Sequence, residues 1–292
     1  MINVEQLQVK YGEFTALEIN DPITIEKGDR IGIIGLNGAG KSTFIKAILG
    51  LVKYSGKINT EVDMRNMAVH MQENNYVQSM PVKYIIQAVL NADIRKNKKL
   101  KELIDFFDFA PSLNKKFHTL SGGQKQRLTI ILVLMQDAPI TFFDEITSGL
   151  DFETREILMG KIKEWYKNAD SALCMVTHYY DELNNLTDKL LILEKGKVVA
   201  FGKTCALFER YCGKVLIVTD NNEKNSLLTK GFAQAEAPPH LLAFSCDSIE
   251  DEIGIVTTLS THNVDYKRVS NDIEILYANA IKQMKSGGAS NG

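Results

Sequence analysis

The chain has 292 residues, of which 45% are hydrophobic and 24% are charged. This composition supplies a sizeable core and excludes a chain that is disordered overall. The 34 basic and 36 acidic residues leave a net charge of −2, which gives no general attraction to nucleic acid or to an anionic membrane, so we expect no nucleic-acid partner.

The N-terminal residues, the apolar runs and the cysteines predict a cytoplasmic protein. The first residues lack a basic stretch followed by an apolar one, so we expect no signal peptide. The longest apolar run lies around residues 130–135, far short of the roughly 20 residues that cross a bilayer. Neither disulfide nor zinc-ligand spacing is present, and we expect reduced thiols at Cys174, Cys205, Cys212 and Cys246.

The first 212 residues alternate predicted strands with predicted helices. Period-two alternation and short apolar runs predict strands at residues 3–10, 23–26, 30–34, 140–143, 172–176, 190–193 and 197–201, with short strands inside 56–72. Helical spacing of apolar residues predicts helices at residues 44–51, 81–113, 121–135 and 154–166. This alternation is typical of an α/β sheet.

The tail after about residue 213 has an alternation of its own. Strand-like segments at 215–219, 241–246 and 264–269 are interleaved with helical segments at 223–230, 249–260 and 273–285. We expect a small C-terminal α/β domain over residues 213–285 and a flexible, Gly/Ser-rich tail over residues 286–292.

A glycine-rich loop follows the strand at 30–34 and opens the next helix. Residues 35–42 match G-x-x-x-x-G-K-[ST] at every position, and the backbone N–H groups of such a loop cradle phosphate oxygens. Lys41 is expected to reach the β- and γ-phosphates and the Ser42 hydroxyl to bind Mg²⁺. The residues expected around the phosphates are Gly35, Leu36, Asn37, Gly38, Ala39, Gly40, Lys41, Ser42 and Thr43.

Two adjacent carboxylates, Asp144 and Glu145, follow the apolar strand at residues 140–143. The carboxyl ends of parallel strands are where α/β sheets bind ligands. We therefore expect Asp144 to hold the Mg²⁺ shell and Glu145 to orient or deprotonate an attacking water.

A serine and two glycines begin the helix at residues 121–135. Ser121 offers an N-capping hydroxyl, and Gly122 and Gly123 leave the positive end of the helix dipole accessible. These residues predict a second anion site.

Residues 120–127 read LSGGQKQR, and with this stretch the sequence resembles the nucleotide-binding subunit of an ABC transporter. The resemblance covers residues 1–212, and its signature motif includes Gln124. It implies an ATPase with a P-loop NTPase fold. That fold would combine a RecA-like α/β lobe, an N-terminal antiparallel β region and an α-helical subdomain at about residues 73–135, followed here by the small C-terminal α/β domain.

Other motifs of the ABC family fall in order along the chain, and the resemblance implies their roles. Tyr11 matches the aromatic residue that stacks on adenine, and Gln72 matches a glutamine that binds Mg²⁺ and links to the membrane partner. Asp151 matches the D-loop, and His178 matches the switch histidine at the γ-phosphate. Ile146 departs from the family pattern, which has proline there, and is expected to loosen the turn.

The resemblance also implies that two ATPase subunits work together. Two copies, or this chain and a paralogue, would pack head to tail around two ATP molecules with Mg²⁺. The residues that would act from one chain are Lys41, Ser42, Gln72, Asp144, Glu145 and His178. The signature residues that would act from the other chain are Ser121, Gly122 and Gly123.

The implied membrane partner is a separate transmembrane permease subunit. The chain would bind it from the cytoplasmic face of the membrane, as a peripheral protein, through the segment at about residues 73–82 and the start of the next helix. Tyr76, Met80 and Tyr84 are candidate contacts, although local packing explains them equally well.

The C-terminal domain resembles the appendage of drug- and peptide-exporter ATPase subunits. We expect export of a hydrophobic drug, a lipid or an amphipathic peptide, including cytolytic peptides. The alternative is an importer ATPase subunit, which the lack of a longer regulatory domain makes less favoured.

Two further alternatives lie outside transport. One is a soluble ABC ATPase that acts on ribosomes or DNA. The DNA-repair members carry a long coiled coil, for which the 80 residues between Lys41 and Ser121 leave no room, and the translation factors carry two cassettes. The other is a non-hydrolysing regulatory module, which an intact Glu145 and His178 disfavour.

Overall fold

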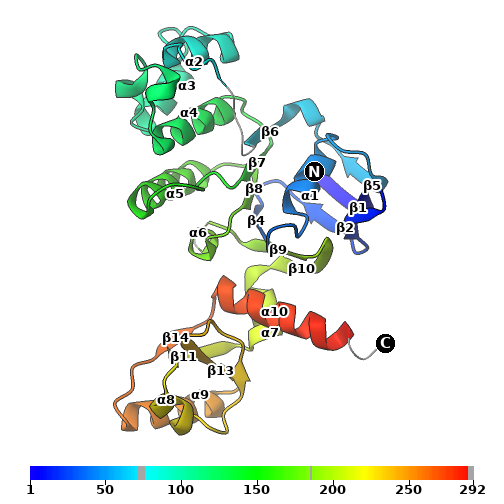
Figure 1. Cartoon of the computed structure of the whole chain (residues 1–292), viewed down its shortest axis with the longest axis vertical. Helices are drawn as coiled ribbons and strands as arrows, with labels where there is room; N and C mark the ends of the chain where they lie inside the picture. Colours follow the sequence, from blue (N-terminus) through cyan, green and yellow to red (C-terminus); the bar gives the residue numbers. More distant parts are fainter. Residues whose placement is uncertain (71–75, 185, 289–292) are drawn as a thin grey trace.

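The computed structural model describes residues 1–70, 76–184 and 186–288, and most strands of this part belong to one large sheet. Its strands in chain order are β1 (Ile2–Tyr11), β2 (Phe14–Ile19), β3 (Ile23–Ile25), β4 (Arg30–Ile34), β5 (Ser55–Thr60), β6 (Met67–His70), β7 (Ile140–Asp144), β8 (Ala172–Val176), β9 (Lys189–Glu194) and β10 (Lys197–Lys203). Their spatial order is β3-β1-β2-β10-β9-β4-β8-β7-β6, with β5 paired to β1 (Figure 1).

The large sheet has an antiparallel and a parallel part. Strand β1 pairs antiparallel with β2, β3 and β5. Strands β9, β4, β8, β7 and β6 run parallel, and all five residues of both β7 and β8 are buried, as expected for strands covered on both faces. The carboxyl ends of β4, β7 and β8 therefore meet at one edge of the sheet.

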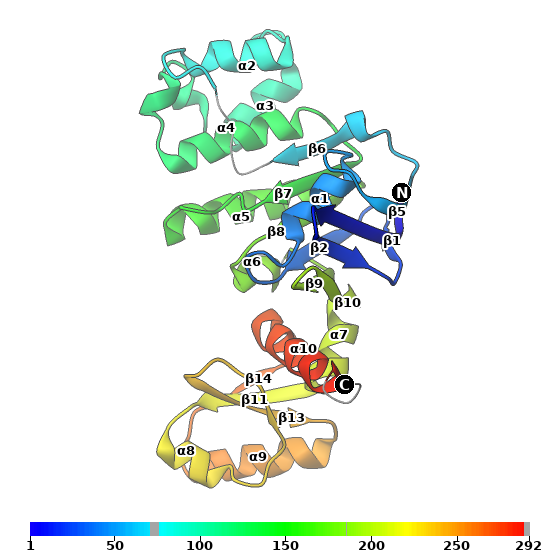
Figure 2. The same cartoon turned by 45° about the vertical axis from the view of Figure 1, so that its right-hand side comes forward.

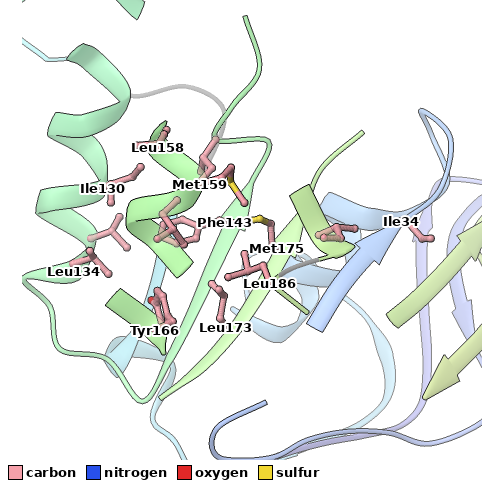
Figure 3. Packing of buried hydrophobic residues seen from close by; sticks show 14 of the residues in the cluster. Ile34, Ile130, Leu134, Phe143, Leu158, Met159, Tyr166, Leu173, Met175 and Leu186 are labelled. Carbon is pink, nitrogen blue, oxygen red and sulfur yellow. The ribbon is translucent and has the colours of Figure 1, made fainter. Parts of the chain in front are cut away.

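Helices cover both faces of the parallel part. They are α1 (Lys41–Ile48), α2 (Val82–Leu90), α3 (Lys98–Phe106), α4 (Gly122–Leu134), α5 (Phe152–Tyr166) and α6 (Tyr180–Asn184). Figure 3 shows Phe143 and Met175 of the sheet facing Leu158 of α5 and Ile130 of α4. The packing of these side chains holds α4 and α5, which carry the predicted signature and D-loop residues at their N-termini, against the sheet.

The smaller sheet is built by the C-terminal third of the chain. Its elements, with the helix before it, are α7 (Thr204–Cys212), β11 (Val215–Asp220), α8 (Glu223–Leu228), β12 (Gln234–Ala235), β13 (Leu241–Cys246), α9 (Ile249–Thr261), β14 (Lys267–Val269) and α10 (Ile273–Gly288). The strands lie in the order β12-β13-β11-β14, and every pair is antiparallel.

The two faces of the smaller sheet belong to different cores, because alternate strand residues point to opposite faces. Ile217 and Phe244 pack with Ile255 of α9. Leu216 and Ala243, on the other face, belong to the cluster that includes residues of α7, α10 and the large sheet. Figures 1 and 2 show α7 and α10 between the two sheets.

Most predicted elements are present at or near their predicted positions. The strands predicted at 30–34, 172–176 and 241–246 have the same first and last residues as β4, β8 and β13. The sequence analysis missed β2, α6, α7 and β12. Two of these, α6 with five residues and β12 with two, are too short to show a period.

Three predicted boundaries need comment. Helix α1 begins at Lys41 rather than at residue 44, since the polar residues 41–43 hide its first turn from an apolar pattern. Residues 286–288, at the start of the predicted flexible tail, are helical, and the Ser286 hydroxyl donates to the Lys282 carbonyl at 3.1 Å. The flexibility of the tail stays a prediction. The subdomain bounds 73–135 and 213–285 stay predictions.

No helix among the described residues is long and apolar enough to cross a bilayer.

The shared core predicts that α10 contributes strongly to stability. Leu276 of α10 is fully buried in that core, so Leu276→Ala should lower the free energy of unfolding by about 2–5 kcal/mol in urea titration. Leu227→Ala, at a position 67% exposed on α8, is the matched control and should change it by less than about 0.5 kcal/mol. If both variants change the free energy of unfolding by the same small amount, the packing of α10 in this core is contradicted.

Candidate functional site

The glycine-rich loop lies between β4 and α1, with its first residue against strand β9. Gly35 has φ 153°, and a Cβ atom there would collide with the Leu193 carbonyl oxygen. Gly40 precedes α1 with φ 102°, a conformation that favours glycine. The two glycines therefore let the backbone follow a path that other residues would block.

Lys41 is buried, with 6% of its surface exposed, beneath this loop. Its ammonium group donates to the Gly35 carbonyl at 2.7 Å and the Leu36 carbonyl at 3.1 Å. Burial lowers the pKa of Lys41, and the charges of Glu145 and Asp144 oppose this shift. The loop thus encloses a cation at the place where the motif predicts phosphates.

Asp144 is buried at the end of β7, and its carboxylate accepts a hydrogen bond from the Ser42 side chain. Desolvation raises the pKa of Asp144, the Ser42 hydrogen bond opposes this, and the charge of Glu145 adds to it. Among the described residues, Oδ1 of Asp144 has no hydrogen-bond partner.

The donor set around Asp144 suits Mg²⁺. A hydroxyl and a carboxylate with a buried, unpaired oxygen are hard oxygen ligands of the kind that this ion uses together with phosphates and waters. Within the ranges that the structure describes, no cluster of three or more His, Cys, Asp or Glu residues forms a metal site. Ser42 and Asp144 thus fit a cation shared with phosphates better than an all-protein cage.

Glu145 and His178 lie together although 33 residues separate them. Oε1 of Glu145 is 2.8 Å from Nε2 of His178. The two residues follow neighbouring parallel strands, and the Glu145 N–H donates to the Val176 carbonyl at 2.9 Å. Glu145 has φ 54°, in the left-handed region. The fold therefore pairs the predicted base with the predicted switch histidine.

A buried network that the sequence analysis missed supports the His178 loop. The Thr177 hydroxyl donates to Glu182 at 2.6 Å, and Nε of Arg155 on α5 lies 3.5 Å from the same carboxylate. The Arg155 guanidinium lies 3.8 Å from the Tyr179 ring centroid. Burial raises the pKa of Glu182, against the hydrogen bond from Thr177. This network links α5 to the loop, and no local pattern predicts contacts between such distant segments.

A cavity of about 740 Å³ brings the predicted residues together. It is lined by Tyr11, Phe14, Ala16, Asn37, Gly38, Ala39, Gly40, Lys41, Ser42, Thr43, Glu145, Ser148 and His178. Phe14 was not predicted. It pairs with Tyr11 across the turn between β1 and β2, and both rings are more than half exposed. The sequence Tyr-Gly-Glu-Phe, two aromatic residues across a two-residue turn, is the signal that would have found it.

The signature residues cap α4 and do not line this cavity. The Ser121 side chain accepts from the Gln124 N–H at 3.3 Å, and the Gln124 side chain accepts from the Ser121 N–H at 3.1 Å. Ser121 and Gly122 are exposed, and Gly123 faces Thr154 of α5. Asp151 caps α5, accepting from the Thr154 N–H at 3.0 Å. These capping hydrogen bonds stabilise the first turns of α4 and α5 and leave both helix N-termini on the surface.

The candidate membrane-partner residues divide into buried and exposed positions. Gln72 lies outside the described residues. Tyr76 and Met80 are partly buried against the core, and the Tyr76 ring lies 5.3 Å from that of Phe117. Tyr84 is 50% exposed. Only Tyr84 is thus largely open to a partner.

Ile146 is 1% exposed and belongs to the large core. Its side chain packs inside the protein at the turn where the family has proline. The expected loosening of the turn stays a prediction.

The fold and the cavity define a class of protein. A strand, a glycine-rich loop with a buried lysine and a helix, together with two carboxylates at the end of the parallel strand β7, form the site of a P-loop nucleotide-binding protein. A sequence profile described as "ABC transporter" matches residues 20–148.

Known relatives identify the family. The energy-coupling factor transporter ATP-binding protein EcfA1 of Mycoplasmopsis pulmonis is 32% identical over 223 residues, which cover 70% of this chain and 83% of that protein. The chain therefore belongs to the ATP-binding subunits of ABC transporters, a family of ATPases that bind ATP. This confirms the expected fold class and the expected enzyme class.

Relatives with import and with export in their names also match. The methionine import ATP-binding protein MetN of Corynebacterium efficiens is 29% identical, over 64% of this chain and 57% of that protein. The Nod factor export ATP-binding protein I of Rhizobium sp. (strain N33) is 29% identical, over 65% of this chain and 67% of that protein. The match to MetN thus spans little more than half of that protein.

A solved structure agrees with the fold. The structure of cbiO1 from Clostridium perfringens, described as part of the ABC transporter complex cbiONQ, has a TM-score of 0.62 and 26% identity, and covers 71% of this chain and 90% of that one.

The raised pKa of Asp144 predicts that Asp144→Asn stabilises the protein at neutral pH when nucleotide and divalent cations are absent. The folded chain favours the protonated carboxyl. Ionisation of Asp144 therefore costs no folding stability below the ordinary pKa of 3.8. The loss of stability appears as the pH rises through the raised pKa of the folded state. Thermal unfolding in EDTA, followed from acid to neutral pH, should show a gain in Tm that grows with pH.

The control for this experiment is Asp170→Asn. The hydrogen bond and charge of Lys27 lower the pKa of Asp170, so this variant should give no gain at neutral pH. A pH-independent effect of Asp144→Asn, or a loss of stability at neutral pH, would contradict the assignment of a desolvated carboxylate.

Proposed function

We propose that this chain binds and hydrolyses ATP with Mg²⁺ in the described cavity and thereby drives a separate transmembrane permease subunit. The observation that carries the catalytic part is the 2.8 Å pair between Glu145 and His178 beside the glycine-rich loop. Lys41 and the loop N–H groups would hold the phosphates, and Tyr11 would stack on the adenine. Ser42, Asp144 and Gln72 would bind Mg²⁺, which neutralises charge on the phosphates.

The chemical step follows from the position of the carboxylate. Glu145 would accept a proton from a water that attacks the γ-phosphorus; the new P–O bond forms as the bond to the bridging oxygen of ADP breaks. His178, within hydrogen-bond distance of Glu145, would orient this carboxylate and contact the γ-phosphate. ADP and inorganic phosphate leave.

We propose that a second ATPase subunit completes the site. Ser121 and Gly122 are exposed at the start of α4 and do not line the cavity of their own chain. A helix N-terminus with an exposed serine is suited to contact a γ-phosphate. Ser121, Gly122, Gly123, Gln124 and the D-loop Asp151 would therefore act on the ATP bound by the other subunit, whether a second copy or a paralogue.

The transport role rests on the relatives and on the surface near α2. The relatives described above are ATP-binding proteins of transporters. Val77 and Tyr84, within the predicted contact region, are 58% and 50% exposed. We propose that this surface receives the permease on the cytoplasmic face of the membrane.

The direction of transport has two candidates. Export has one relative named for it, but the hydrophobic or amphipathic substrate that we expected from the sequence has no support among these relatives. Import is supported by the relative named for methionine import. A soluble role on ribosomes or DNA has no counterpart among these relatives.

Glu145→Gln tests the catalytic assignment. The amide cannot accept the proton, so ATP hydrolysis should fall by about 10²- to 10⁴-fold, while binding of a fluorescent ATP analogue stays within a few-fold. Steady-state phosphate release and equilibrium titration measure the two effects. Glu102→Gln, at an exposed position on α3, is the matched control, and normal turnover in the Glu145 variant would remove Glu145 from the mechanism.

Co-purification from the native cell tests the transport role. A tagged chain should bring down a multispanning membrane protein after gentle solubilisation, alone or with a second ATPase, which also settles the composition of the dimer. Substrate flux in vesicles rebuilt from that complex separates export from import. Recovery only with ribosomes or DNA factors would leave the ATPase chemistry intact and overturn transport.

A further inference from the structure

Helix α10 returns from the smaller sheet to the large sheet that carries the nucleotide site. It packs against α7, α6 and β10, and Figures 1 and 2 show it between the two sheets. Its buried residues Leu276 and Ala280 belong to the core that includes Phe143 and Ile34 of the large sheet. The helix is thus firmly held on one side of that site.

Tyr277 of α10 faces two segments of the site. Its hydroxyl lies 3.5 Å from Oε2 of Glu194, at the end of β9. Its ring centroid lies 5.9 Å from that of Tyr180, with an angle of 32° between the planes. Glu194 is 5% exposed, so its carboxylate depends on partners such as this hydroxyl.

These neighbours adjoin groups that the proposed reaction uses. Glu194 follows Leu193, whose carbonyl abuts Gly35 of the glycine-rich loop. Tyr180 lies two residues after His178. A change at Tyr277 would therefore reach both the support of the loop and the segment that carries the switch histidine.

The ionisation of Tyr277 agrees with this placement. Burial raises the pKa of Tyr277, the charge of Glu194 and the hydrogen bond to it add to the shift, and the backbone of Leu36, inside the glycine-rich loop, opposes it. The phenol therefore stays neutral at physiological pH and can donate to the carboxylate.

We propose that Tyr277 is a positioning residue for ATP binding, through which the C-terminal region holds the glycine-rich loop and its supporting strand in the binding conformation. The proposal rests on the proposed function, since it assigns the loop to ATP. It gives the C-terminal region a part in the affinity for nucleotide. Tyr277 does not line the cavity, so it acts through Glu194 and Tyr180.

The test is a titration of the full-length chain with a fluorescent trinitrophenyl analogue of ATP in the presence of Mg²⁺. Tyr277→Phe keeps the ring and removes only the hydroxyl. The loss of one hydrogen bond should raise the Kd by about threefold to tenfold, while kcat measured at saturating ATP stays within about twofold. Tyr266→Phe, on the chain just before β14 and outside the site, is the matched control and should leave the Kd unchanged.

A second variant separates positioning from simple loss of structure. Glu194→Gln weakens the same hydrogen bond from the acceptor side and should also raise the Kd. The Kd of the double variant should not exceed the larger Kd of the two single variants, because both substitutions act on one hydrogen bond. A merely structural role would lower Tm and the fraction of active protein while leaving the Kd of the active fraction unchanged, and that result overturns the proposal.

The outcomes also distinguish a failure of the role proposed for Tyr277 from a failure of the proposed function. If the wild-type chain fails to bind the analogue, the proposed function itself falls. If the wild-type chain binds and Tyr277→Phe binds equally well, the proposed function stands and the positioning role of Tyr277 is overturned.

Discussion

The contact between the glycine-rich loop and the backbone of β9 is the constraint on which the site depends. At Gly35 there is no room for a side chain beside the Leu193 carbonyl. The loop therefore rests on the strand itself, and its own carbonyls are brought over Lys41. A movement of β9 would be transmitted directly to the loop, which explains why residues that contact the end of β9, such as Tyr277, matter to the site.

The parallel strand order adds the second half of the site. Strands β4, β8 and β7 are neighbours, so the groups that follow them meet although they are far apart in the chain. The loop follows β4, His178 follows β8, and Asp144 and Glu145 complete and follow β7. The helices on both faces fix this edge by burial, and the site needs little structure of its own beyond short loops.

The sequence predicted best what depends on neighbouring residues. The glycine-rich loop, the cap at Ser121 and the strand before Asp144 are local patterns, and the structure contains each of them. The pairing of Glu145 with His178 depends on strand order; the family resemblance implied only that both residues act at one site. Phe14, the Arg155–Glu182 network and Tyr277 were not predicted, because their partners belong to other elements and no spacing along the chain records such contacts.

The backbone at Glu145 has a consequence for how the proposed catalytic carboxylate is held. A non-glycine residue with φ 54° occupies a region that costs on the order of 1 kcal/mol or more for an L-amino acid. The surrounding strands supply that energy when the chain folds. The main chain thus fixes the direction of the Cα–Cβ bond of Glu145 before any substrate arrives. The same strain makes this point of the chain a local energetic weakness. A backbone that relaxed out of the left-handed region would also move the Glu145 side chain away from its present position.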